Sequence, residues 1–425
     1  MNNIIVQKFG GTSVADTDKI KKVADAVIKE KKNGNDVVVV VSAMGHTTDY
    51  LVKMAHEISS NPSGREMDML LSTGEGVSIA LLAMAIQSKG YEAISFNATQ
   101  IGIITENVHQ KARIIDIKTD KLKKNLKDGK VIVVAGFQGI TDDNEITTLG
   151  RGGSDTSAVA LAAALNAKRC DIYTDVEGVY TTDPRVVKNA SRLDNISYDE
   201  MLELARVGAN VLHPRSVETA KQFNVPLRVR STFKLNNEGT LIVSAKDMEL
   251  FRPVTGVAAD LSQIRVVMCD VPDVPGNAAK LFGALAKENI SVDMIIQSYA
   301  RKSNNTNDIA FTIDKPDYER ATNVLEKIKQ DLKASNVYID KEIAKVSIVG
   351  AGMVDRPGIA STMFETIADL GINIKMISTS EIKISCLVKE SEAEESVKAL
   401  HKVFELDCDE VAEVKGDLPP EEIMG

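Results

Sequence analysis

The first half of the chain alternates short apolar runs with helical patterns, and this alternation constrains the fold most. Ile4–Phe9, Asp36–Met44 and Lys130–Phe137 are apolar runs. The second reads "DVVVVVSAM", continuously apolar as in a strand buried on both faces. Apolar residues from Ile20 to Ile28 recur on one helix face. Strands alternating with helices predict an α/β unit, a mainly parallel sheet sandwiched by helices.

The remaining elements of this unit follow the same reasoning. Residues 170–176 and 226–231 predict two more strands, and the second of these is expected to be the last strand of the sheet. Helices are expected around residues 50–59 and 77–88 and in the alanine-rich run 155–167. Ligands of such sheets collect at the carboxyl ends of the strands, so the loops after the strands are where the site is expected.

A segment of 25 residues occurs twice after residue 250. Val274–Ser298 parallels Arg356–Ser380, with Pro275 and Pro357 standing 82 residues apart. Each copy predicts a strand, a Pro-Gly loop, a helix and a strand, followed by a further strand. We therefore expect two copies of one small α+β module. The expected domains are residues 1–245, 262–342 and 343–418.

Composition excludes several classes of function. The 425 residues carry a net charge of −9, with 4% aromatic residues and no Trp, which disfavours binding to nucleic acid or an anionic membrane. The four cysteines form no CxxC pair and the five histidines are isolated, so no protein metal site is expected. The N-terminus lacks a signal-peptide pattern, and no apolar stretch approaches the roughly 20 residues of a membrane span. A cytoplasmic protein is expected.

Two glycine-rich loops indicate an anion site. "KFGGTS" (residues 8–13) follows the first strand, and "TLGRGGSD" (residues 148–155) precedes the alanine-rich helix. Glycines let backbone N–H groups approach a ligand closely, and the following helices add positive dipole ends. Lysine suits phosphate as a point charge, and arginine suits the two oxygens of a carboxylate. A tight turn beside a solvated lysine is the alternative.

Three other loops are weaker candidates. "SAMGHTTDYL" offers hydroxyls after the second strand, but Ser and Thr also cap helices routinely. Glu75 in "STGE" either favours a helix N-terminus or holds an ammonium group. "YTDVEGVYTTDPR" (residues 173–185) is either a turn and hairpin or part of a nucleotide site.

Some motifs are interpreted as structural. Gly350-x-Gly352 follows a strand, but the third glycine of a dinucleotide fingerprint is missing and Asp355 stands in its place. His109 and His213 are expected to be structural. No G-x-S-x-G is present, so an acyl-enzyme hydrolase is not supported.

Taken together, these motifs resemble those of the aspartate kinases in the amino acid kinase family. The resemblance rests on "KFGGTS", "SAMGHTTDYL", "STGE", "TLGRGGSDTSA", "YTDVEGVYTTDPR" and "GANVLHPRS", and the repeated segment resembles two ferredoxin-like ACT domains, which bind amino acids. It implies transfer of the γ-phosphoryl of ATP to the side-chain carboxylate of L-aspartate, on the route to lysine, threonine and methionine. It also implies Mg²⁺ carried by ATP, and a homo-oligomer formed through the ACT domains.

The resemblance assigns roles to individual residues. Lys8 and Asp155 are the catalytic candidates. The substrate candidates are Ser42, Thr48, Glu75, Arg151 and Ser154. The nucleotide candidates are Lys8, Phe9, Gly10, Gly11, Gly152, Gly153, Thr174, Asp175, Tyr180, Asp183, Pro184, Arg185 and Asn210. At position 210 members of the family commonly carry lysine, so this contact is missing or replaced by backbone here.

The ACT resemblance implies feedback inhibition by lysine, threonine or both. In the first copy the effector candidates are Asp273, Val274, Pro275, Gly276, Asn277, Ala278, Asp293 and Gln297. In the second copy they are Ile359, Ala360, Asn373, Ile374, Ser380 and Glu381. A tight turn with strand core is the alternative interpretation for each of them.

Three alternatives compete with this interpretation. A carboxylate or carbamate kinase of the same fold is one, and "KFGGTS" with the tandem repeat favours aspartate over it. A catalytically inactive amino-acid sensor is another, which the presence of Lys8, Arg151 and Asp155 disfavours. The sequence ends too early for fusion to a homoserine dehydrogenase domain.

Overall fold

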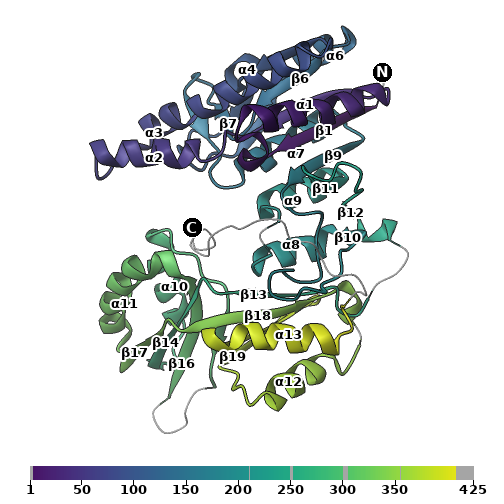
Figure 1. Ribbon diagram of the computed structural model, residues 1–425. Coiled ribbons are helices and arrows are strands. Elements are labelled where there is room, and N and C mark those ends of the chain that lie inside the picture. The colour runs from purple at the N-terminus through teal and green to yellow at the C-terminus, as the bar shows by residue number, and fades with distance from the viewer. Residues whose placement is uncertain (1–2, 210, 249–251, 300–304, 355, 408–425) are drawn as a thin grey trace. The chain divides into compact units, whose positions relative to one another are not determined.

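The computed structural model describes residues 3–209, 211–248, 252–299, 305–354 and 356–407 (Figure 1). Contacts between residues divide the chain into two compact units. The first unit comprises Met1–Thr181 and Ser191–Phe251, and the second comprises Thr182–Ala190 and Arg252–Gly425. The short segment Thr182–Ala190, in the first half of the chain, thus belongs to the second unit.

An eight-stranded sheet forms the centre of the first unit. Its strand order is β10-β12-β11-β9-β1-β2-β6-β3, and all neighbours are parallel except β11 and β12. The strands are β1 (Ile4–Phe9), β2 (Asp36–Val41), β3 (Ala93–Phe96), β6 (Val131–Ala135), β9 (Arg169–Thr174), β10 (Asn195–Ser197), β11 (Leu227–Ser231) and β12 (Thr240–Val243). The predicted α/β class with a mainly parallel sheet is confirmed.

Helices cover both faces of this sheet. α1 (Thr17–Lys32) and α4 (Thr73–Gln87) share one core with the sheet, into which Phe9, Val39 and Val133 point. α7 (Gly153–Ala164) contacts β1, β2 and β9. The other helices are α2 (Thr47–Ile58), α3 (Gly64–Leu71), α5 (Ala98–Ile101), α6 (Asp120–Lys127), α8 (Tyr198–Arg206) and α9 (Pro214–Phe223). All six residues of β2 are buried, as its continuous valine run predicts.

A small second sheet, not predicted from the sequence, lies in the same unit. Its order is β5-β4-β7-β8, formed by β4 (Ile103–Thr105), β5 (Ile114–Ile117), β7 (Gln138–Ile140) and β8 (Ile146–Thr148). These strands have three or four residues each, too few to show a clear period. β8 ends at Thr148, so this sheet leads directly into the glycine-rich loop.

The strand at residues 226–231 is not the last of the central sheet, so that prediction was wrong. β12 follows it and pairs antiparallel with β11, with Val229 opposite Thr240. The intervening turn includes Gly239 at φ +76°, where a Cβ would collide with the backbone of Val229. β12 itself offers only "TLIV" as a sequence signal, which is short for an assignment from pattern alone.

Contrary to the expectation from the sequence, one stretch of the described residues is long and apolar enough to cross a membrane by length and composition. It runs through Gly64–Gln87, which spans α3 and α4, with a mean hydropathy of 1.7 in its most apolar window. The buried face of α4 carries Ile79, Leu82 and Ile86, which pack against the central sheet. The same helix buries the carboxylate of Glu75. We interpret α4 as a core helix.

The second unit contains two four-stranded antiparallel sheets, in the orders β15-β16-β14-β17 and β13-β18-β20-β19. The strands are β13 (Gly256–Asp260), β14 (Gln263–Pro272), β15 (Ile295–Gln297), β16 (Thr306–Asp314), β17 (Asn336–Asp340), β18 (Ile343–Val349), β19 (Met376–Thr379) and β20 (Lys383–Lys389). The helices are α10 (Asn277–Lys287), α11 (Tyr318–Leu332), α12 (Ile359–Asp369) and α13 (Ala393–Val403).

The two copies of the repeated segment adopt the same local structure. Gly276 precedes α10 at φ +96°, and Gly358 precedes α12 at φ +105°. Both glycines occupy the left-handed region, which other residues rarely adopt, and this explains the shared Pro-Gly pair. β13 lies before the first copy in sequence but pairs with β18 in the sheet of the second copy.

The glycines of the dinucleotide-like motif have a packing role. A Cβ at Gly350 would overlap the carbonyl of Pro253, and one at Gly352 would overlap the carbonyl of Arg252. Both glycines therefore allow the chain at residues 252–253 to pass close to the end of β18. This packing accounts for the motif without a nucleotide.

Candidate active site

Lys8 and Asp155 form an ion pair at the carboxyl end of β1. The Nζ atom of Lys8 lies 2.6 Å from Oδ1 of Asp155, and both side chains are 13% exposed. Residues alternate faces along a strand, so Lys8 points away from the core that contains Phe9. Asp155 stands in the first turn of α7, where a carboxylate is favoured by the helix dipole.

The glycine-rich loop before α7 is shaped by close packing. Gly152 caps the helix at φ +65°, and a Cβ at this position would overlap the ring of His213. A Cβ at Gly153 would lie 2.8 Å from Cδ2 of Phe137. At position 152, only glycine fits both the positive φ and the space left by the His213 ring. Without a side chain, the backbone N–H groups of this loop remain accessible.

The loop after β1 packs against the loop after β2. A Cβ at Gly11 would lie 2.9 Å from the carbonyl oxygen of Ala43, and Gly45 N–H donates to the carbonyl of Gly11 at 3.0 Å. Gly10 lies beside Lys8, whose Nζ would be 3.4 Å from an added Cβ. The side chain of Phe9 is fully buried and stacks on Tyr173, so any ligand contact of Phe9 must use its backbone.

Two serines connect the second loop to the glycine-rich helix. The Ser42 hydroxyl donates to Oγ of Ser154 at 2.9 Å. Ser154 also packs against Gly136, where an added Cβ would lie 2.8 Å from its Oγ. Ser42 follows the parallel strand β2, and Ser154 stands beside Asp155 in the first turn of α7, so this contact joins the loop after β2 to the helix that carries the partner of Lys8.

Glu75 is a buried carboxylate with an unusual pKa. Its side chain accepts from Ala43 N–H at 3.2 Å and from Nε2 of Gln138 at 3.4 Å. Burial raises the pKa of Glu75 to about 7, although backbone N–H groups and Gln138 oppose this shift. No cation of the described residues pairs with this carboxylate, so a positively charged group of a ligand would stabilise its ionised form.

Arg151 is the exposed cation of the glycine-rich loop. Within the ranges that the structure describes, its guanidinium makes no hydrogen bond or ion pair, so it is available to an anion. Thr48, in the first turn of α2, is half-buried. The structure thus groups Lys8, Asp155, Ser42 and Ser154 by direct contacts and places Arg151 on the same loop as Ser154.

The predicted nucleotide segment is divided between the two units. Thr174, Asp175 and Tyr180 belong to the first unit, where the Thr174 hydroxyl donates to the carboxylate of Asp175 at 2.9 Å. Asp183, Pro184 and Arg185 belong to the second unit, where Arg185 pairs with Asp183 through two nitrogens. Asn210 lies outside the described residues.

The effector candidates of the second unit lie on several of its elements. Asp273 accepts from the amide of Asn307 at 3.1 Å, and Asn277 donates to the carbonyl of Pro272 at 2.8 Å. The carboxylate of Asp293 lies 2.6 Å from Nζ of Lys345. The other candidates fall on the Pro-Gly loops, the first turns of α10 and α12, β15 and the segments flanking β19: Val274, Pro275, Gly276, Ala278, Gln297, Ile359, Ala360, Asn373, Ile374, Ser380 and Glu381.

Sequence reasoning missed several residues of these sites. Gly136 and Gln138 follow β6 and contact Ser154 and Glu75, and their position after a buried strand was an available signal. No local signal identified His213 as the ring packed on Gly152. Its pKa is lowered by burial and then by Arg215, consistent with a structural role.

Comparison with known proteins identifies the class. Residues 3–231 match the model of the amino acid kinase family, and residues 264–328 and 346–404 match an ACT domain model. The chain therefore belongs to the amino acid kinase family and carries two ACT segments.

Relatives of known name narrow this class further. The chain is 56% identical to an aspartokinase of Bacillus sp. (strain MGA3) over 95% of this chain and 97% of that protein. It is 53% identical to aspartokinase 2 of Bacillus subtilis (strain 168), over 95% and 98%. The structure of E. coli aspartokinase III with aspartate and ADP matches with a TM-score of 0.81 at 29% identity, over 94% and 99%. The chain groups with the aspartokinases.

Proposed function

We propose that this chain transfers the γ-phosphoryl of ATP to the side-chain carboxylate of L-aspartate, giving 4-phospho-L-aspartate. The observation that carries the proposal is the Lys8–Asp155 pair, 2.6 Å long, at the carboxyl end of β1 and the N-terminus of α7. It combines a positioned cation with a glycine-lined helix N-terminus, the two features a transferred phosphoryl group requires.

The reaction brings two anions together, and the proposed roles follow from this obstacle. Aspartate is already ionised at neutral pH, so no general base is needed to activate it. Lys8 would bridge the transferred phosphoryl group and the attacking oxygen, with Asp155 orienting its ammonium. The backbone N–H groups at Gly10, Gly11, Gly152 and Gly153 would donate to phosphate oxygens. Catalysis then consists of positioning and electrostatic stabilisation.

The substrate pocket would bind aspartate by its three charged groups. Arg151 would hold a carboxylate with its planar fork, which is free of partners within the described ranges. Glu75 would hold the α-ammonium, because a buried carboxylate gains most from a matching charge. Ser42, Thr48 and Ser154 would complete the pocket with hydroxyl donors.

The nucleotide would lie along the loops that follow β1 and β9. Thr174, Asp175 and Tyr180 of the first unit are the proposed contacts, besides Phe9 through its backbone. Mg²⁺ would be held by ATP phosphates and water. The site fits this arrangement, since its carboxylate, Asp155, is already paired with Lys8. In the described part of the chain, no three His, Cys, Asp or Glu side chains could jointly hold a metal ion.

Regulation by an amino-acid end product is the second part of the proposal. A relative, E. coli aspartokinase III, has been solved with lysine and aspartate in a T-state, and 29% of residues are identical. We propose lysine as the first effector candidate and threonine as the second, bound at the Pro-Gly loops of the second unit. Homodimerisation would use the edge strands β15 and β19, since exposed edges favour pairing. The pathway and a cytoplasmic location follow from the same proposal.

One assay tests the proposal and its rivals. ADP release is coupled to a reporter with aspartate, then repeated with glutamate, with carbamate, and with lysine, threonine or both added. Aspartate-dependent release that the effectors reduce is the expected result. Release with another acceptor only would favour a different carboxylate or carbamate kinase, and no release with effector binding retained would favour an inactive sensor.

A further inference from the structure

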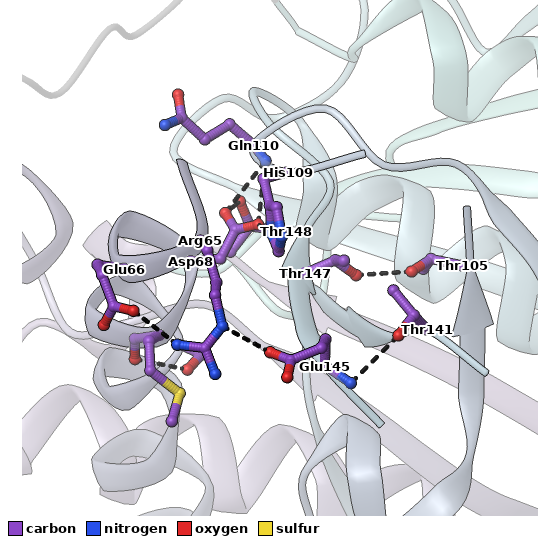
Figure 2. Close-up of polar contacts among 12 residues, drawn as sticks. Arg65, Glu66, Asp68, Thr105, His109, Gln110, Thr141, Glu145, Thr147 and Thr148 are labelled. Carbon is purple, nitrogen blue, oxygen red and sulfur yellow. Dashed lines mark hydrogen bonds and ion pairs between the residues drawn. The ribbon is translucent and has the colours of Figure 1, made fainter. Parts of the chain in front are cut away.

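A buried carboxylate outside the proposed pocket connects three segments of the first unit. Asp68, on α3, is fully buried, and Figure 2 shows the groups that converge on it. The Thr148 hydroxyl donates to its Oδ1 at 2.6 Å, and Gln110 N–H donates to both oxygens at 3.1 Å. Nδ1 of His109 lies 2.7 Å from Oδ2. A carboxylate buried so completely is stable only when its oxygens are satisfied in this way.

These donors come from the two segments that form the base of the glycine-rich loop. Thr148 is the last residue of β8, and its carbonyl accepts from Ala112 N–H at 3.0 Å. Thr148 is therefore held by its side chain and by its backbone at once. A Cβ at Gly150 would lie 2.8 Å from the carbonyl oxygen of Gln110, so the loop passes directly over the segment that Asp68 holds.

The next residue of the loop is also fixed. Leu149 N–H donates to the carbonyl of Phe137 at 2.9 Å, and its own carbonyl accepts from Nη1 of Arg215 at 2.7 Å. Arg151 follows two residues later, with its side chain exposed. The backbone before Arg151 is thus determined by buried contacts, whereas its guanidinium is left free within the described ranges.

We propose that Asp68 is a positioning residue, which acts through Thr148 to place Arg151 for the acceptor carboxylate. The Arg151 guanidinium can bind both oxygens of a carboxylate only if its Cα is held in place. A displacement of about 1 Å at a reacting group costs up to 10²-fold in rate. The inference rests on the proposed function, since it concerns the substrate clamp of that reaction.

The neighbouring residue provides a matched control. Thr147 is also fully buried, and its hydroxyl lies 2.6 Å from that of Thr105 (Figure 2). Thr147 and Thr148 point to opposite sides of β8, and each makes one short hydroxyl contact. A second contact between α3 and the β7–β8 hairpin is the ion pair of Arg65 with Glu145 at 2.8 Å. Both side chains are nearly half exposed, so this pair contributes little to stability.

The test compares Thr148→Val, Thr148→Ser and Thr147→Val in the full chain. We expect Thr148→Val to raise KM for aspartate about tenfold, with KM for ATP within about twofold of wild type. Thr148→Ser retains the donor and should restore wild-type values. Thr147→Val should lower thermal stability by about as much as Thr148→Val does. It should not raise KM for aspartate relative to KM for ATP.

If Thr148→Val does not fold, a second pair of variants tests the same proposal. Thr148→Ala and Thr148→Ser differ by one hydroxyl, and a higher KM for aspartate in the alanine variant alone supports the proposal. Equal changes in both KM values, or an equal effect of Thr147→Val, would overturn it. If wild-type protein shows no aspartate-dependent ADP release, the proposed function fails instead, so the two failures are distinguishable.

Discussion

Lys8 and Asp155 come from the first strand and from a helix in the middle of the chain, and their charged atoms meet at 2.6 Å. Each of the two side chains is mostly buried, which removes competing water from the pair. An ammonium held in this way is placed before substrate arrives, so little reorganisation remains when charge develops during transfer.

Replacing this ammonium should abolish most of the turnover. We expect Lys8→Ala to lower kcat roughly 10³-fold, because removal of one group aimed at the developing charge typically costs 10² to 10³. A coupled ADP-release assay measures this change. Lys31→Ala is the matched control, since Lys31 pairs with Asp36 at 3.0 Å at the amino end of β2, where its loss should leave kcat unchanged. Near-normal turnover in Lys8→Ala would refute the assigned role.

Arg151→Lys should change KM for aspartate much more than KM for ATP. Lysine keeps the positive charge but loses the planar fork, so KM for aspartate should rise at least tenfold while KM for ATP changes little. Steady-state kinetics with each substrate varied in turn provides the measurement. Arg65→Lys, at an exposed pair with Glu145, serves as the control. Equal increases in both KM values would argue against a carboxylate clamp.

The raised pKa of Glu75 predicts a pH dependence of aspartate binding. Its carboxyl has a pKa of about 7 in the free protein because it is buried, so protonation below this pH removes the charge that pairs with the α-ammonium. KM for aspartate should therefore rise as pH falls through 7 toward 5.5. Glu75→Gln should have a high KM that no longer changes over this interval. An unchanged slope in that variant would exclude Glu75 as the titrating group.

Gly152 should tolerate no side chain. Gly152→Ala combines a positive φ with a collision against His213, and we expect kcat/KM to fall at least 10²-fold as the loop shifts. Gly129→Ala separates the two effects, because Gly129 has φ +83° but no heavy atom within 4 Å of an added Cβ. That control should cost about 1 kcal/mol of stability, because alanine is disfavoured in the left-handed region, and should leave the kinetics normal. Similar kinetics in both variants would disprove the crowding argument.

Effector binding is best tested by a point substitution in the second unit. Deleting residues beyond 250 should remove inhibition, but Thr182–Ala190 belongs to the second unit and would lose its contacts. Asp273→Ala removes the acceptor beside the first Pro-Gly loop, and we expect the concentration of effector for half-inhibition to rise about tenfold or more. Kinetics without effector should be unchanged. Asp331→Ala, at an exposed position of α11, is the control. Unaltered inhibition would place the effector elsewhere.

The sequence determined the class of fold and indicated which loops form the candidate site. The valine run of β2 predicted a strand buried on both faces, and the repeat at Pro275 and Pro357 predicted two similar modules. These signals are local: an apolar period or a glycine requirement is written within a few residues of the element it forms.

Tertiary structure alone decided which distant groups meet. Burial raises the pKa of Glu75, and the donors that oppose this shift, Ala43 N–H and the Gln138 amide, come from two other segments. Asp68 carries no local signal, since a single acid on a helix is ordinarily solvated, yet here it is fully buried and contacts donors from the end of β8 and from the loop at residues 109–110. Burial and pairing across the chain are sums over many contacts, so they exist only once the sheet has brought the strand ends together.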